Sequence, residues 1–175
     1  MDSPRKNQQK QLVLQYINEK YIENNNKGTN AITKVEYEQV VKGLKALRKG
    51  KVIDEKLKRR IQNRGFKLQE KDGKPILVEK TFKGSLPVTP VEECFEKIYQ
   101  THSIHGGHCG IGKTDDLLKS RFCGIPRCVI QYFINVCPVC NLKKNQVRID
   151  NYYFLYKICK FTYYCLRLTG HRVKQ

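Results

Sequence analysis

Two motifs overlap at residues 102–114, HSIHGGHCGIGKT, and they predict different chemistry. In the first, His102 and His108 precede a Cys137-x-x-Cys140 pair. Imidazole nitrogen and thiolate sulfur are the ligands that zinc prefers in tetrahedral structural sites. The second has the letter pattern G-x-x-x-x-G-K-T of a phosphate-binding P-loop. The same residues can hardly serve both purposes. The sequence around them indicates which of the two interpretations is favoured.

The spacing of the four ligands favours zinc. Five residues separate His102 from His108, 28 residues follow, and two residues separate Cys137 from Cys140. His102 is expected at a helix end, His108 in a glycine-rich loop, and the Cys pair at the end of a later helix. One zinc ion would therefore join the ends of a small helical bundle. Without the metal, the hydrophobic core of this bundle is expected to be too small for a stable fold. Its role would be structural, because four protein ligands leave no open position for water.

Other histidines and cysteines offer alternatives to this ligand set. His105 could replace His102, but His102 continues the apolar face of its helix, whereas His105 precedes two glycines and is expected to be exposed. Cys109 directly follows His108, and adjacent residues rarely bind one ion well. Three further cysteines are predicted to be small buried hydrophobes: Cys94, Cys123 and Cys128. A single histidine on an apolar face is more often a core residue, so the zinc prediction depends on all four ligands together.

The P-loop pattern lacks its structural context. A P-loop follows a buried strand and directs backbone N–H groups at phosphate from a helix N-terminus. Here an amphipathic helix is expected before the glycines, and no apolar strand ending in Asp comes after them to bind magnesium. Nucleotide binding through Lys113 is therefore the least favoured interpretation.

The chain carries a large and uneven positive charge. Its formal net charge is +18 with a pI near 9.6, and from residue 117 onward Asp150 is the only acidic residue. Such an excess attracts polyanions, nucleic acid first and an acidic membrane surface second. Basic residues expected on exposed faces are candidate phosphate contacts: Lys113, Lys119, Arg121, Arg127, Lys143 and Lys144. The alternative for each is ordinary solvated surface.

The cysteines and the N-terminus indicate a reducing environment. MDSPRKNQQK has no apolar core and no cleavage site of a secretory signal. Without a secretory context, Cys137-x-x-Cys140 is expected to bind metal rather than to form part of a disulfide framework. No apolar run reaches the roughly 20 residues that span a bilayer. These features therefore predict an intracellular location with no membrane partner, and the nucleus is the compartment expected for the chain.

The N-terminal half is predicted to contain three helices and a hairpin. Residues 9–24 place Leu12, Val13, Tyr16 and Ile17 on one helical face. A second helix begins at a capping box of Thr33 and Glu36, with Ile32 and Tyr37 as a hydrophobic staple. A shorter helix comes after Asp54 and stops at Gly65. Asp72-Gly73 then predicts a hairpin, in which Pro75 limits the pairing of the second strand. Residues 81–90 are interpreted as a linker.

Three more helices are predicted between residues 89 and 140. Thr89 and Glu92 form a second capping box, with a proline at the first helical position. The apolar face of this helix contains Val91, Cys94, Phe95, Ile98, Tyr99 and His102. The next helix is expected to begin near Thr114, and the last at Pro126, with Val129, Ile130, Phe133, Ile134 and Cys137 on its buried side.

The stretch from His102 to Lys144 resembles the HHCC zinc-binding module of retroviral and gypsy-type retrotransposon integrases. The resemblance is carried by His102, by GGHCGIGKT, by Ile125-Pro126 and by VIQYFINVCPVCNLKK. It is nearest to domesticated, integrase-derived proteins of the KRAB-A-domain-containing-2-like type. It implies a three-helix, helix-turn-helix-like zinc bundle that associates with other subunits and touches DNA. Cys123 departs from the family, in which an aromatic residue is usual.

In the integrases that this stretch resembles, a catalytic core comes after the zinc module and holds metal with three carboxylates. Residues 141–175 contain Asp150 as their sole acid, so no catalytic residues are predicted and the chain is expected not to be an enzyme. The tail at 149–175 has crowded aromatic and basic residues that could stack on nucleic acid. A product of intron read-through or a degenerate coding end is the favoured interpretation of this tail.

The predicted fold is therefore mostly α, with a zinc-stabilised three-helix bundle preceded by a helical region and a β-hairpin. The expected divisions are an N-terminal helical region (1–65), a hairpin and linker (66–88), the zinc module (89–148) and the tail (149–175). The expected function is a non-catalytic module, derived from an integrase, that binds zinc and binds DNA or multimerises, alone or with integrase-like proteins. The alternative is a zinc-dependent protein-interaction module that does not bind DNA.

Overall fold

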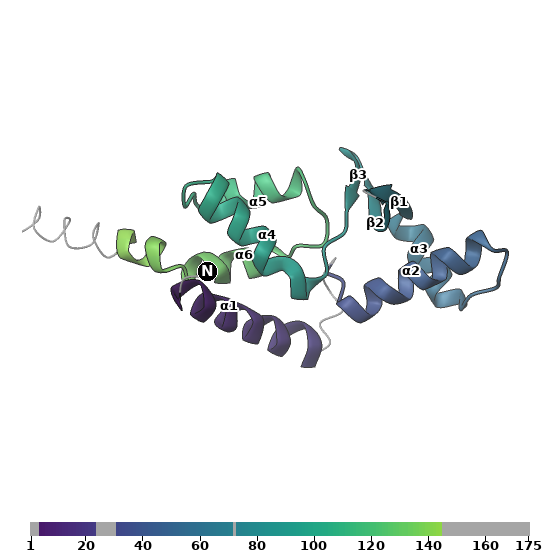
Figure 1. Ribbon diagram of the computed structural model, residues 1–175, viewed down its shortest axis with the longest axis horizontal. Coiled ribbons are helices and arrows are strands. Elements are labelled where there is room, and N and C mark those ends of the chain that lie inside the picture. Colours follow the sequence, from purple (N-terminus) through teal and green to yellow (C-terminus); the bar gives the residue numbers. More distant parts are fainter. Residues whose placement is uncertain (1–3, 24–30, 72, 145–175) are drawn as a thin grey trace, which may run out of the picture. The chain divides into compact units, whose positions relative to one another are not determined.

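A computed structural model describes residues 4–23, 31–71 and 73–144 of the chain. The chain divides into two compact units, Met1–Cys137 and Pro138–Gln175. The first contains all the helices and strands labelled in Figure 1, and in the second residues 138–144 are helical. The tail predicted at 149–175 lies outside the described residues. The predicted mostly α class is confirmed, and none of the described helices is long and apolar enough to cross a membrane.

The first helix belongs with the C-terminal helices of the first unit. α1 (Pro4–Ile17) continues into the π-helical turn η1 (Asn18–Glu23), and α1 contacts α4 (Cys94–Tyr99) and α6 (Arg127–Asn135) (Figure 1). The buried Gln9 donates through Nε2 to the Phe133 carbonyl at 3.2 Å, and the Tyr16 ring stacks on Tyr132 at 4.2 Å. The prediction of Leu12 on the buried face is wrong, since Leu12 is 40% exposed and Gln9 occupies that face instead.

Both predicted helix starts in the next segment are confirmed. α2 (Lys34–Arg48) has the capping box of Thr33 and Glu36. Burial opposes the ionisation of Glu36, but hydrogen bonds from Arg60 and from the Thr33 N–H outweigh it and lower the pKa of its carboxyl. α3 (Glu55–Arg64) begins at its N-cap Asp54 and ends at Gly65, whose φ of 61° is left-handed. Local capping groups therefore define these helix boundaries, and Arg60 adds a tertiary hydrogen bond at the start of α2.

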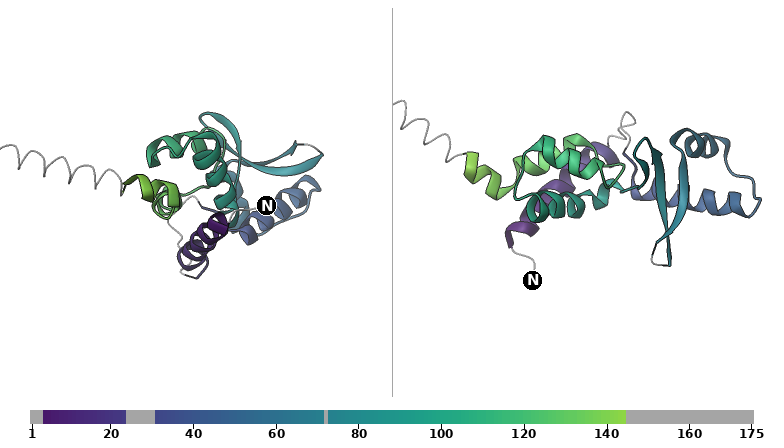
Figure 2. Two further views of the ribbon diagram at one scale, coloured as in Figure 1. Left: turned by 60° about the vertical axis from the view of Figure 1, so that its left-hand side comes forward. Right: turned by 90° about the horizontal axis from the view of Figure 1, so that it is seen from above.

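A three-stranded antiparallel sheet in the order β1-β2-β3 comes after these helices. β1 (Phe66–Lys71) and β2 (Lys74–Thr81) form the predicted hairpin, and α2 and α3 lie against the sheet (Figure 2). β2 is central, but β3 pairs only from Val78 onward, so the missing N–H of Pro75 interrupts no bond to β3. The linker prediction is wrong for β3 (Gly84–Pro87), which pairs with β2.

The sheet and its two helices enclose their own core. Its buried members are Ile32, Val40, Ile61, Phe66, Leu68, Leu77 and Val88. Tyr37 packs against this cluster and its hydroxyl accepts a hydrogen bond from the Leu77 N–H, which places both residues of the predicted staple at the same core. The elements from α2 to β3 therefore have a hydrophobic core that contains none of the predicted zinc ligands.

The remaining elements of the first unit form a helical bundle with α1. The 3₁₀ turn η2 (Val91–Glu93) precedes α4, which runs into the π-helical turn η3 (Gln100–His105), and α5 (Ile111–Lys119) and α6 come next. The predicted buried face of α6 is confirmed, as is its start after Pro126. α5 begins three residues before the predicted Thr114, because Gly110 is its N-cap.

The capping box predicted at Thr89 and Glu92 is wrong. The Thr89 N–H donates to the Cys123 carbonyl, and no side chain caps the turn after Pro90. The Glu92 carboxylate instead accepts the Lys34 N–H with both oxygens at 2.9 Å, at the start of α2. A tertiary hydrogen bond has therefore replaced the local one that the motif predicts.

Candidate metal centre

Four side chains converge in the arrangement that the sequence predicts. One ligand atom from each of His102, His108, Cys137 and Cys140 lies within 4.8 Å of the others. His102 and Cys137 are almost fully buried, and Cys140 is 8% exposed. Two imidazoles and two thiols this close together could hold a metal ion, and their donor set suits tetrahedral coordination.

His102 is held in one orientation by three neighbours. Its Nδ1 lies 3.4 Å from Thr114 Oγ1, and its Nε2 lies 3.3 Å from His108 Nδ1. Thr114 Oγ1 is 2.9 Å from the Gly110 carbonyl to which it donates, so it accepts the Nδ1–H of His102. The Phe133 ring meets the His102 ring edge to face at 5.6 Å. The Nε2 lone pair therefore faces the other ligands, as in metal sites whose histidines donate their second N–H to a supporting group.

His108 lies in a left-handed backbone conformation, which directs its side chain to the site. Its φ is +61°, and it follows Gly107, whose φ is +55°. Its N–H donates to the His102 carbonyl at 2.8 Å, which closes the loop between the two histidines. Its Nδ1 lies 3.4 Å from Cys137 Sγ, so His108 offers Nδ1 where His102 offers Nε2. The two consecutive left-handed residues are what bring the second imidazole over the first.

The cysteine pair is positioned by the end of α6. The buried face of α6 runs from Val129 to Ile134, and Cys137 comes after it with its N–H donating to the Ile134 carbonyl at 3.3 Å. Cys140 comes three residues later, within the helical residues 138–144. α6 ends before Cys137 and the helical residues 138–144 begin directly after it, so Cys137 lies between two helices, and its Sγ and that of Cys140 belong to the ligand group.

The other candidate ligands lie outside this group. His105 is exposed, as predicted, and Cys109 Sγ lies 3.2 Å from Thr114 Oγ1. Burial raises the pKa of the Cys94 thiol, and the carboxylates of Glu92 and Glu93 act in the same direction. Burial also raises the pKa of Cys123 to about 11. Cys94 is the small buried residue that the sequence predicts, whereas Cys123 and Cys128 are only half-buried.

The structural context of a P-loop is not met. Among the described residues, those that lead into Gly107 are the helical α4 and η3, where a P-loop requires a strand. Thr114 is fully buried and its hydroxyl is bonded to backbone. The supporting role of Thr114 beside His102 is the part of the site that sequence reasoning missed. The sequence feature that could have indicated this role is the position of Thr114 in the first turn of the helix that comes after the glycine-rich loop.

The six predicted phosphate contacts are all exposed. Two of them, Lys119 and Arg127, form ion pairs with the buried Asp115. Lys113 and Arg121 lie at the two ends of the α5 segment, and Lys143 and Lys144 lie in the helical residues 138–144. Their contact with DNA stays a prediction.

Gly106, in the loop between the two histidines, has no room for a side chain. A Cβ there would lie 2.6 Å from the Thr101 carbonyl oxygen and 2.8 Å from Cys109 Sγ. Because backbone cannot yield as a flexible side chain does, we expect Gly106→Ala to displace the loop and weaken metal affinity at least tenfold. Competition with a chromophoric chelator measures this affinity. Gly112→Ala is the control, since nothing lies within 4 Å of its Cβ position, and equal affinities of the two variants would contradict the prediction.

Comparisons of the chain with protein-family models, with curated proteins and with solved structures found no match.

Proposed function

We propose that this chain is a zinc-stabilised, non-catalytic module that binds DNA or multimerises, and that it derives from a retrotransposon integrase. The observation that carries the proposal is the convergence of His102, His108, Cys137 and Cys140 within 4.8 Å. These are the four residues that the resemblance to the HHCC module implies. The convergence supports the resemblance because the histidines and cysteines come from separate elements of the chain.

Zinc is the proposed ion, and its role is structural. Two thiolates and two imidazoles form one of the common donor sets of tetrahedral structural zinc. All four positions are supplied by protein, which leaves none for a water nucleophile. The ion joins the loop after α4 to the segment after α6. It therefore stabilises the folded bundle and takes no part in a reaction.

Charge supports DNA as the partner. The chain has 34 lysines and arginines against 16 acidic residues. All six candidate basic residues are exposed, where phosphate oxygens could reach them. Nucleic-acid affinity built on such contacts depends on the release of counterions from the phosphates.

Binding of a fluorescent DNA duplex, followed by anisotropy at several salt concentrations, tests this function. Affinity is expected to fall steeply with salt, with a logarithmic slope of about 0.9 for each phosphate neutralised. The double variant Lys113→Ala, Arg121→Ala is expected to reduce that slope by about two. Its control is Lys45→Ala, Lys56→Ala, which removes two exposed lysines of α2 and α3 and is expected to leave the slope unchanged.

Duplex binding that is absent, or that does not change with salt, would contradict the DNA-binding part of the proposal. Zinc-dependent self-association measured by sedimentation would then favour the multimerising module. Nucleotide binding that Lys113→Ala abolishes would favour the P-loop interpretation instead.

A further inference from the structure

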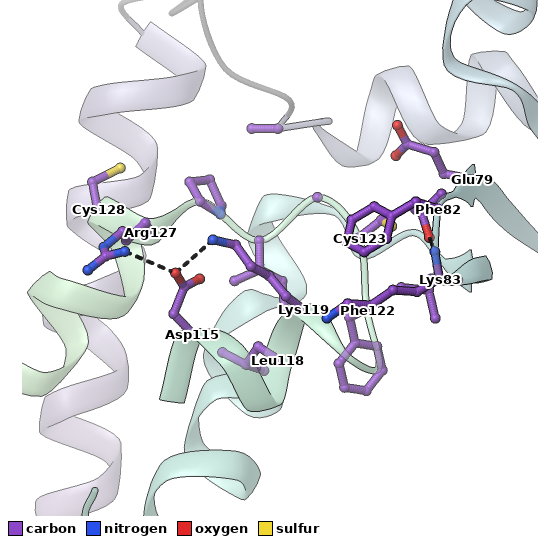
Figure 3. Close-up of a pocket in the computed structure, with 16 residues that line it drawn as sticks. Glu79, Phe82, Lys83, Asp115, Leu118, Lys119, Phe122, Cys123, Arg127 and Cys128 are labelled. Atoms are coloured by element: carbon purple, nitrogen blue, oxygen red, sulfur yellow. Dashed lines mark hydrogen bonds and ion pairs between the residues drawn. The ribbon is translucent and has the colours of Figure 1, made fainter. Parts of the chain in front are cut away.

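A cavity of about 650 Å³ opens between the sheet and the helix α5. Its walls come from β2, the turn after β2, α5 and the segment that joins α5 to α6 (Figure 3). Ligand sites typically have volumes of about 300–1,000 Å³ and are mostly apolar, with a few polar groups at defined positions. The volume of this cavity lies within that range, and the four metal ligands do not line it.

Backbone hydrogen bonds join the two walls of the cavity. Val88 and Cys123 form a parallel bridge, in which the Thr89 N–H donates to the Cys123 carbonyl and the Cys123 N–H donates to the Pro87 carbonyl, both at 2.9 Å. The bridge connects the end of β3 to the segment after α5. The cavity is therefore part of the tertiary structure and not a gap between loosely packed elements.

One end of the cavity contains a buried carboxylate with two exposed cations around it. Asp115 is 2% exposed, and its Oδ2 binds Lys119 at 2.7 Å and Arg127 at 3.4 Å (Figure 3). Two cations around one carboxylate leave a net positive charge, and 58% and 64% of their side chains remain exposed. The other carboxylate oxygen, Oδ1, is buried without a hydrogen-bond partner among the described residues.

The other end of the cavity contains an exposed aromatic ring. Phe82 is 95% exposed and Lys83 lies beside it, with Nζ 5.5 Å from the ring centre. Phe122 lines the same cavity, with the Lys97 Nζ 5.1 Å from its ring. Aromatic rings with adjacent cations are the means by which proteins bind single-stranded nucleic acid, since bases stack on the rings and phosphates meet the charges.

We propose that this cavity receives an unpaired base of single-stranded nucleic acid. The base stacks on Phe82 at the cavity mouth, and the flanking phosphates lie against Lys83, Lys119 and Arg127. Charge complementarity selects this occupant, because the exposed rim is cationic while the walls are apolar. The inference rests on the proposed nucleic-acid function and adds a preference for unpaired strands.

The absence of tryptophan from the chain permits a direct test. Phe82→Trp places the only tryptophan of the chain at the cavity mouth, where it can be excited selectively over the ten tyrosines, and stacking of a base quenches its emission. We expect quenching by a single strand of about 12 nucleotides, a length within the usual range of site sizes. Val52→Trp is the matched control, since Val52 is 98% exposed and does not line the cavity, and its emission is expected to stay unchanged.

Affinity provides the second arm of the test. Phe82→Ala is expected to weaken single-strand binding about tenfold, as the loss of one stacked base does, and to leave duplex binding unchanged. Duplex binding with no quenching and no effect of Phe82→Ala would overturn the cavity inference but not the proposed function. Failure to bind either form of DNA would overturn the cavity inference together with the DNA-binding part of the proposed function. Self-association of the chain that Phe82→Ala abolishes would assign the cavity to a second copy and overturn the inference.

Discussion

Cys137→Ser is expected to abolish zinc binding and to unfold the bundle of α4, α5 and α6, whereas the elements from α2 to β3 keep their structure. Structural zinc sites contribute about 10–16 kcal/mol in zinc-finger peptides, which is comparable to the entire stability of a domain, about 5–15 kcal/mol. Two of the ligands, Cys137 and His102, are almost fully buried in this bundle. The cluster around Val40 and Leu77 contains no metal ligand and should survive the loss of the ion.

Elemental analysis of the purified chain and amide hydrogen exchange measure the two parts of this prediction. The wild-type chain is expected to hold one zinc ion, and Cys137→Ser and His102→Ala none. His105→Ala is the control, since His105 is exposed and lies outside the ligand group, and it should retain both zinc and protection. A folded wild-type chain without zinc, or protection in α4–α6 that survives Cys137→Ser, would contradict the prediction.

Phe133→Ala is expected to lower the free energy of unfolding of the zinc-loaded protein by about 3–5 kcal/mol, the usual cost of deleting a fully buried phenyl ring. Phe133 is 0% exposed at the centre of the bundle. Its ring lies 5.4 Å from that of Phe95 and 5.6 Å from that of His102. The substitution therefore removes core packing and one of the supports of a metal ligand together.

Urea unfolding at saturating zinc, followed by circular dichroism, checks this value. The matched control is Phe82→Ala, which removes the same atoms from a side chain that is 95% exposed and should change the free energy of unfolding by less than about 0.5 kcal/mol. Zinc affinity of Phe133→Ala should also fall, since His102 loses its edge-to-face neighbour. Equal stabilities of the two variants would show that Phe133 is not the core residue that its burial indicates.

Local capping and turn chemistry made several boundaries predictable. Thr33 and Glu36, Asp54 and Gly65 define helix ends through hydrogen bonds and backbone angles within a few residues, and the structure confirms each. The strands on either side of residues 72–73 form the predicted hairpin for the same reason. The period of the apolar residues in α6 likewise predicted its buried face, because the side of a helix that packs must be apolar.

Predictions failed where a distant residue competes with a local one. Thr89 and Glu92 have the letters of a capping box, but Glu92 caps the start of α2 instead, 58 residues away. The short segment Gly84–Pro87 contains no alternating pattern, and it becomes a strand only because the edge of β2 is available for pairing. The apolar pattern predicts Leu12 on the buried face, but Gln9 occupies that face because the Phe133 carbonyl accepts a hydrogen bond from its amide N–H.

The sequence by itself determined the mostly α class, the hairpin and the identity of the four metal-ligand candidates. It could do so because ligand type, ligand spacing and helix caps are local properties of the chain. Only the tertiary structure decided that α1 joins the bundle, that Thr114 orients His102, and that a cavity separates the sheet from α5. Each of these depends on side chains from separate elements meeting in space, which spacing along the chain does not determine.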